Sequence, residues 1–242
     1  MGTMVGGGRP WTVDERAHAG RENLDPAHVA RYDSKEDGDD AGELAALREL
    51  GIGESATVVD LGAGTGQFAL AAAAAVRRVV AVDVSPVMLD QLRAKLRQLE
   101  VDNVECVAAD FLTYEHRGEP ADLIYSRYAL HHLPDFWKAL ALVRIAEMLR
   151  PGGILRLWDV VYGFEPAEAE AGLERWISTA TSETVDEDWT RAELEEHVRD
   201  ENSTFTWLLE PMLEKAGLAI EQAEYSEDRI FARYTCVRGG SS

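Results

Sequence analysis

The sequence predicts an α/β fold: a doubly wound seven-stranded sheet, mostly parallel with a C-terminal antiparallel strand, plus a helical cap. Five short runs rich in Val, Ile and Leu alternate with segments that have the periodicity of helices. Near-continuous apolar strands that alternate with helices are typical of a parallel sheet covered on both faces. Two further apolar runs near the C-terminus lie too close together for a crossover helix, so we expect them to pair antiparallel.

The elements follow one another in this order. The first five strands are expected at 57–61, 78–84, 103–110, 121–127 and 153–161. The helices between them are expected at 68–76, 86–99 and 134–149. The second of these has the clearest start, because Ser85 is a good N-cap and Pro86 suits a first helical position.

The rest of the chain surrounds this core. A helix over 43–50, closed by Gly51, belongs to an N-terminal segment that we expect to cover the sheet. A helix over 205–216 precedes the two last strands, at 218–226 and 229–237. The predicted organisation is a disordered arm (1–10), an N-terminal helical lid (11–50), a doubly wound α/β core (51–162), a cap of two amphipathic helices (163–204) and the completion of the core (205–238).

Composition narrows the classes of partner. With 46% hydrophobic residues the 242-residue chain can bury a full core, and a net charge of −20 argues against binding nucleic acid or anionic membranes. No apolar run approaches the ~20 residues of a membrane span, and the N-terminus lacks the pattern of a signal peptide. Cys106 and Cys236 lie far apart within apolar runs, as buried thiols of a reducing compartment do. We therefore expect a cytoplasmic protein.

The stretch VVDLGAGTGQF, residues 58–68, joins a strand to a helix through three glycines. Glycines in this spacing let a ligand approach main-chain N–H groups at a helix start. A dinucleotide fingerprint would have its third glycine one position after Gly66, and a triphosphate loop would need a Lys that is absent. A purely structural turn is the alternative.

Two acidic residues end the next two strands. Asp83 is placed to accept hydrogen bonds from vicinal ribose hydroxyls. Asp110 is followed by Phe111, and an acceptor beside an aromatic ring suits the amine and ring of adenine. Either acid alone would be unremarkable as a solvated strand end. The glycine turn and the two acids, however, end three successive strands, and together they indicate a nucleoside site.

Together these motifs, with DLIYSRYALHHLPD and MLRPGGILRLWD further on, resemble class I S-adenosylmethionine-dependent methyltransferases of the small-molecule type over residues 57–161. The resemblance implies S-adenosyl-L-methionine as cofactor. It also implies that the glycine turn holds the aminoacyl end, that Asp83 holds the ribose and that Asp110 holds adenine. The cofactor-binding residues carried over on this basis are Tyr32 (in a lid segment), Asp60, Gly62, Ala63, Gly64, Gly66, Asp83, Val84, Met88, Asp110, Phe111, Ser126 and Arg127.

His131 and His132 follow the fourth strand, where a methyl acceptor should lie, and are the candidate catalytic bases. Tyr128 is a weaker candidate, and a role in packing or backbone bonding is the alternative for both histidines. Adjacent histidines cannot easily face one ion and no third ligand is spaced nearby in the sequence, so we expect no metal site.

The sequence thus predicts a methyltransferase that moves a methyl group to the O, N or C atom of a small molecule. A non-catalytic cofactor-binding protein of the same fold and a nicotinamide-dependent oxidoreductase are the alternatives. The acidic cap could attract a cationic acceptor or be only a solvated face. The acceptor and the oligomeric state, a homodimer included, stay open.

Overall fold

The computed structural model describes residues 10–20, 23–24, 29, 40–180 and 189–240 of the chain. The predicted disordered arm and the predicted lid residue Tyr32 lie outside these described residues, apart from position 10. Within the described part of the chain, no helix has both the length and the apolar character needed to cross a membrane.

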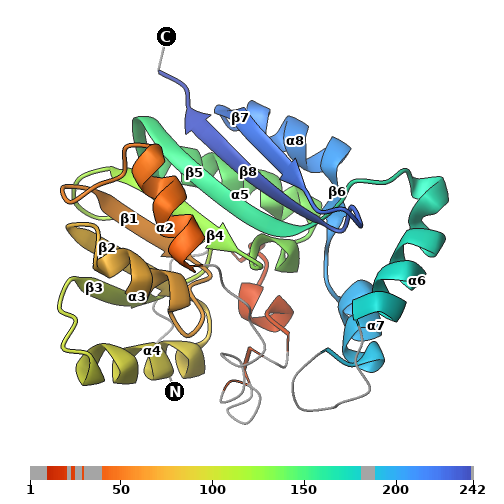
Figure 1. Cartoon of the computed structure of the whole chain (residues 1–242), viewed down its shortest axis with the longest axis horizontal. Coiled ribbons are helices and arrows are strands. Elements are labelled where there is room, and N and C mark those ends of the chain that lie inside the picture. The colour runs from red at the N-terminus through yellow and green to blue at the C-terminus, as the bar shows by residue number, and fades with distance from the viewer. Residues whose placement is uncertain (1–9, 21–22, 25–28, 30–39, 181–188, 241–242) are drawn as a thin grey trace.

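A mixed sheet forms the middle of the molecule (Figure 1). Its strands are β1 (Thr57–Leu61), β2 (Arg78–Asp83), β3 (Val104–Ala108), β4 (Ala121–Arg127), β5 (Leu149–Tyr162), β6 (Thr204–Phe205), β7 (Leu218–Tyr225) and β8 (Phe231–Arg238). The order is β3-β2-β1-β4-β5-β8-β7, with β6 paired to β5 off this path. Strands β1 to β5 run parallel, and β8 is antiparallel to both neighbours. The predicted sheet and its antiparallel hairpin are confirmed.

Helices cover both faces of the sheet (Figure 1). The α-helices are α2 (Asp40–Glu49), α3 (Gln67–Ala73), α4 (Pro86–Gln98), α5 (Asp135–Met148), α6 (Ala169–Ala180), α7 (Arg191–Asp200) and α8 (Thr206–Lys215). Three short 3-10 helices join them: η1 (Glu15–His18), η2 (Leu130–His132) and η3 (Pro166–Glu168). One core cluster packs α2, α3 and α4 on one face, and another packs α5 and α8 on the opposite face.

The two-sided core explains why the strands are continuously apolar. In β1 the side chain of Val58 belongs to the cluster under α3 and α4, whereas Val59 belongs to the cluster under α5. Because successive side chains of a strand point to opposite faces, both must be apolar when both faces are covered. All five residues of β1 are buried.

The start of α4 follows from its first residues. Ser85 is its N-cap, and its hydroxyl accepts a hydrogen bond of 3.3 Å from the backbone N–H of Met88. Pro86 is the first helical residue, where its missing N–H costs nothing. The side chain of Asp83 also accepts from the N–H of Ser85, so the end of β2 and the start of α4 are fixed together.

The cap helices α6 and α7 stand beside the end of β5 (Figure 1) and share with it a small core, separate from the two main clusters. Trp176 is buried there and Phe205 is partly buried, whereas Trp189 and Trp207 are exposed. Several element boundaries differ from prediction by a few residues, and two of these differences concern β5 and β6. Phe205, expected in a helix, pairs with Tyr162 as part of β6, and β5 begins four residues earlier than expected because Leu149 already pairs with Ala121 before an irregularity.

Candidate active site

A pocket with about 640 Å³ of empty space opens at the carboxyl ends of β1, β2 and β4. The glycine turn after β1 forms one side, and the N-terminal segment around η1 forms another. In open parallel sheets this edge is where ligands bind. The lining residues are Glu15, Ala19, Asn23, Leu61, Gly62, Gly64, Val82, Asp83, Val84, Met88, Ala109, Asp110, Phe111, Tyr128, Ala129, His132 and Leu133.

The glycines of the turn serve two different needs. Gly62, Gly64 and Gly66 all have positive φ, at 76°, 53° and 85°. A Cβ on Gly62 would lie 2.3 Å from Cβ of Ala129, and one on Gly66 would lie 2.2 Å from Cδ1 of Leu92. Gly62 and Gly64 line the pocket, whereas Gly66 lines neither this pocket nor its neighbour and instead lets α3 pack against α4.

Asp83 links the turn to the end of β2. One carboxylate oxygen accepts from the N–H of Gly64 and the other from the N–H of Ser85, each at 2.7 Å. Burial raises the pKa of this carboxyl, and the two backbone hydrogen bonds oppose that shift. A carboxylate has about four acceptor positions, so Asp83 keeps acceptor capacity on the side that lines the pocket.

Asp110 is held by the backbone that follows β3. Its Oδ1 accepts from the N–H of Leu112 at 3.1 Å, and from the N–H and the hydroxyl of Thr113 at 2.7 and 2.6 Å. Phe111 is buried in the wall beside it. Val84 and Met88 also line the pocket, so the structure brings these four predicted residues together with Asp83.

Glu15 is a pocket residue that the sequence did not suggest. Its carboxyl oxygens lie 3.2 Å from the N–H of Phe111 and 2.8 Å from the N–H of Leu112, next to Asp110. Burial and the neighbouring carboxylate of Asp110 raise the pKa of Glu15 to about 9. At neutral pH Glu15 is therefore protonated.

A second, more polar pocket of about 330 Å³ shares Gly62 and Gly64 with the first. The predicted residues Asp60, Ala63 and Arg127 line it, and Arg127 donates to the Gln67 side chain at 2.8 Å. Ser126, also predicted to contact the cofactor, is fully buried in β4 and lines neither pocket.

Tyr128 lies where the first pocket meets the cap. It has a φ of 50°, a left-handed conformation that is uncommon for a residue with a side chain. Its ring packs against Trp158 and Phe231, with centroids at 5.4 and 5.8 Å. Strained residues of this kind concentrate at functional sites.

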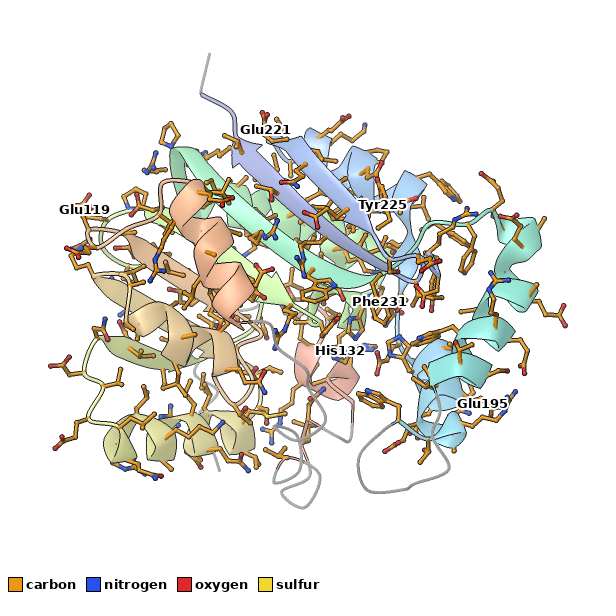
Figure 2. The ribbon with its side chains drawn as sticks, viewed as in Figure 1. Glu119, His132, Glu195, Glu221, Tyr225 and Phe231 are labelled. Atoms are coloured by element: carbon orange, nitrogen blue, oxygen red, sulfur yellow. The ribbon has the colours of Figure 1, made fainter. Side chains whose placement is uncertain are left out.

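His132 lines the pocket and His131 does not. Figure 2 labels His132 between the ends of the strands and α7, the helix that carries Glu195. His131 is enclosed by acids: Nδ1 lies 2.5 Å from Oδ1 of Asp159, and Nε2 lies 2.8 Å from Oε2 of Glu201.

The two neighbouring histidines have opposite pKa shifts. Burial alone would lower the pKa of His131, but Asp159 and Glu201 outweigh it and raise that pKa to about 10. Burial and the adjacent His131 lower the pKa of His132 to about 3. Burial opposes ionisation of Glu201, yet contacts with His131 and His197 hold its pKa below the ordinary range.

Long-range contacts complete this part of the site, and no local pattern in the sequence announces them. Asp159 comes from β5, and Glu201 follows α7 in the cap. The backbone N–H of Asn202 donates to the carbonyl of His131 at 3.0 Å, and its side-chain amide donates to the carbonyl of His132 at 3.1 Å. These bonds fix the cap segment to η2.

Comparisons with known proteins agree with this architecture. Residues 58–153 match the family described as methyltransferase domain. The 27-O-demethylrifamycin SV methyltransferase of Amycolatopsis mediterranei is 30% identical over 54% of this chain and 48% of its own length. The chain spans about half the length of the curated relatives it matches first.

Two solved structures share the fold. Phosphoethanolamine N-methyltransferase 2 of Haemonchus contortus, in complex with S-adenosyl-L-methionine, superposes with a TM-score of 0.71 at 17% identity, covering 95% of this chain and 61% of that one. The [4+2]-cyclase SpnF superposes with a TM-score of 0.64 at 16% identity, covering 84% and 81%. Residues 58–153 of the chain are thus similar to the methyltransferase domain family, and the chain has the Rossmann-like fold of S-adenosylmethionine-dependent methyltransferases.

Proposed function

We propose that the protein binds S-adenosyl-L-methionine in the two adjoining pockets and transfers its methyl group to an O, N or C atom of a small molecule. The observation that carries this proposal is the placement of Asp83 between the glycine turn and the pocket that also holds Asp110 and Phe111. We therefore expect the acceptors for the ribose and for the adenine amine to lie on one wall.

The linings of the two pockets suit such a molecule in their chemistry. The first pocket offers Met88 and Phe111 as apolar walls for a purine. The second pocket offers Asp60 and Arg127, charged partners of both signs for the ammonium and carboxylate of an amino acid.

The bound cofactor would supply an activated methyl group and a good leaving group. The residues of this chain would then have to hold the acceptor in line with the methyl and exclude water. Tyr128 and His132 line the side of the pocket that faces the cap, and they are the residues that we expect to meet the acceptor.

A small-molecule acceptor is supported by what the relatives are named for and by charge. The two transferases compared above are named for a rifamycin and for phosphoethanolamine, so their names include both an O- and an N-methylation. The net charge of −20 disfavours a nucleic-acid acceptor.

Titration calorimetry tests the proposal. S-adenosylhomocysteine should bind with one site per chain, and NADH should not bind; the reverse result would support the oxidoreductase alternative. The structure of the [4+2]-cyclase shows that this fold is found in a protein named for other chemistry. A broad panel of hydroxyl, amine and carbon acceptors tests for methyl transfer. If the cofactor binds but no acceptor is methylated, the result would support the non-catalytic alternative.

A further inference from the structure

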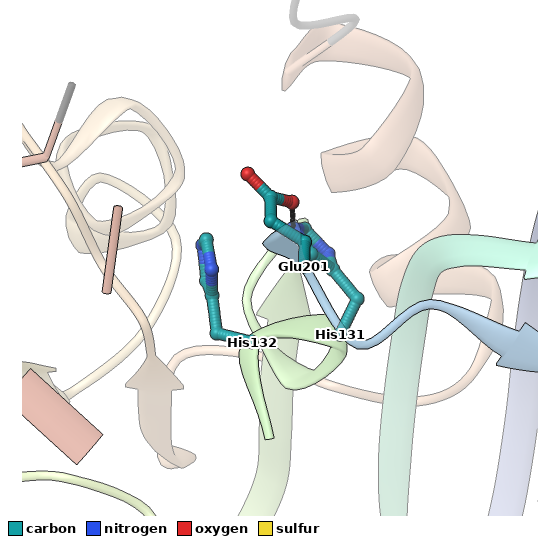
Figure 3. Close-up of side chains that lie close together, drawn as sticks. All are labelled: His131, His132 and Glu201. Carbon is teal, nitrogen blue, oxygen red and sulfur yellow. Dashed lines mark ion pairs between the residues drawn. The ribbon is translucent and has the colours of Figure 1, made fainter. Parts of the chain in front are cut away.

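We propose that His131, His132 and Glu201 form a binding site for one divalent transition-metal ion, with Zn²⁺ as the reference ion, on the cap side of the pocket. Each residue offers a ligand atom, and these atoms all lie within 4.8 Å of one another (Figure 3). Two imidazoles and one carboxylate with an open position are a common ligand set for zinc and for non-haem iron.

The first argument comes from the contact between His131 and Glu201. Oε2 of Glu201 lies 2.8 Å from Nε2 of His131 and 2.5 Å from Nδ1 of His197. Both contacts are within ion-pair distance, but neither has the geometry of a hydrogen bond, and the oxygen is buried. Ligands of one zinc ion lie roughly 3.3 Å apart at bond lengths near 2.0–2.1 Å. A small outward shift of the carboxylate, with release to water of the proton that lies between oxygen and nitrogen, would therefore admit an ion between these two atoms.

The second argument is an unpartnered nitrogen on His132. Nδ1 of this ring is buried without a hydrogen-bond partner, and the ring centroid lies 4.3 Å from that of His131. A buried imidazole nitrogen without a partner costs free energy unless something binds it. A cation shared with His131 and Glu201 would satisfy it.

The third argument is the support behind the ligands. Metal-bound histidines usually donate their other ring N–H to a carboxylate, which orients the ring. Nδ1 of His131 lies 2.5 Å from Oδ1 of Asp159, whose other oxygen accepts from the backbone N–H of His131 at 2.9 Å. This arrangement directs Nε2 toward Glu201 (Figure 3).

The fold also explains why the sequence alone does not predict this site. The expectation of no metal site depended on the absence of a third ligand near the two histidines. Glu201 comes from the cap, and the two hydrogen bonds of Asn202 to the carbonyls of His131 and His132 hold it in place. The third ligand is therefore fixed by tertiary contacts.

The open position of the ion would face the pocket, because His132 lines it. This role depends on the proposed function: an acceptor hydroxyl bound to the ion would lose its proton to water more easily. Its oxygen would then attack the methyl carbon, and the electron pair of the broken carbon–sulfur bond would return to the sulfur. Metal binding itself needs neither the methyl donor nor the acceptor.

The test is zinc binding to the full chain after dialysis against a chelator, measured by titration calorimetry and by metal analysis of the dialysed protein. We expect one Zn²⁺ per chain and much weaker binding of Mg²⁺. Glu201→Gln and His132→Ala should each lower zinc affinity by at least about 100-fold, and Asp159→Asn by about 10–100-fold. His18→Ala, at an exposed imidazole, and Cys106→Ser should leave it unchanged.

Thermal melting of each variant shows whether it is folded. If Asp159→Asn does not fold, the zinc affinity of Glu201→Gln decides the test. Anomalous scattering from a zinc-soaked crystal should place the ion between the three side chains. Absence of stoichiometric zinc, an ion located elsewhere, or full affinity in folded Glu201→Gln would overturn the proposal. Failure to bind S-adenosylhomocysteine would contradict the proposed function but would not affect the proposed metal site.

Discussion

Glu15 and Asp110, far apart in the sequence, meet at the pocket wall, where both engage the backbone N–H of Leu112. Two carboxyl groups this close cannot both ionise without a large electrostatic cost. Burial and Asp110 therefore keep Glu15 protonated, with a pKa of about 9 in place of 4.5. The N-terminal segment is thus attached to the pocket wall that carries Asp110 through a neutral acid.

This attachment predicts how stability depends on pH. The pKa of Glu15 is higher in the folded chain than in the unfolded chain. Its contribution to the free energy of unfolding is therefore fully present below pH 4.5 and is lost progressively as pH rises toward about 9. Glu15→Gln removes this dependence. The free energy of unfolding of this variant should therefore rise relative to that of the wild type as pH increases. Urea unfolding across this range measures the difference. Glu49→Gln, at an exposed position, is the control, and parallel curves for Glu15→Gln and wild type would contradict the assignment.

The sequence was sufficient for the fold because its pattern is local. The apolar runs, the cap at Ser85 and the short C-terminal connection each predict an element directly, and the sheet confirms them. The glycine turn likewise predicted where the pocket opens. Whether the residues carried over by resemblance bind the cofactor stays a prediction.

The rest of the site depends on tertiary contacts that leave no pattern in the sequence. Glu15 reaches the pocket from a short 3-10 helix, and Glu201 reaches His131 from the cap. Neither lies in a motif. The opposite pKa shifts of the two neighbouring histidines also could not be predicted, because they come from burial and from the contacts of His131 with Asp159 and Glu201.

Asp83 should matter for cofactor affinity more than any exposed acid nearby. Asp83→Ala removes the proposed acceptor for the ribose hydroxyls and also frees the N–H of Gly64. We expect the affinity for S-adenosylhomocysteine to decrease by about 1.5–3 kcal/mol, measured by calorimetry. Asp90→Ala, on the exposed side of α4, should have no effect. Wild-type affinity in a folded Asp83→Ala variant would rule out the ribose assignment.

Gly66 should be required for packing. In Gly66→Ala the added Cβ meets Leu92 in a backbone conformation with φ of 85°, so we expect a loss of about 1–3 kcal/mol in the free energy of unfolding. Gly53→Ala is the matched control, since a Cβ there would have nothing within 4 Å and the backbone is not left-handed. Chemical denaturation compares the two. Equal stability of both variants would show that α3 and α4 tolerate a side chain between them.

The last prediction concerns the buried charges that attach α2 to the sheet. The carboxylate of Glu43 accepts from the guanidinium of Arg156 at 3.2 and 3.3 Å and lies 3.3 Å from Arg233, and both Glu43 and Arg156 are buried. Removing one partner leaves the other charge buried and unpaired, so Glu43→Ala should lower the free energy of unfolding by about 3–5 kcal/mol. Glu49→Ala, at the exposed end of the same helix, should change it little. Because well-packed apolar side chains can replace a buried ion pair, the double variant Glu43→Leu, Arg156→Met should recover part of the loss. A loss no greater than that of Glu49→Ala would show that this pair does not hold α2 on the sheet.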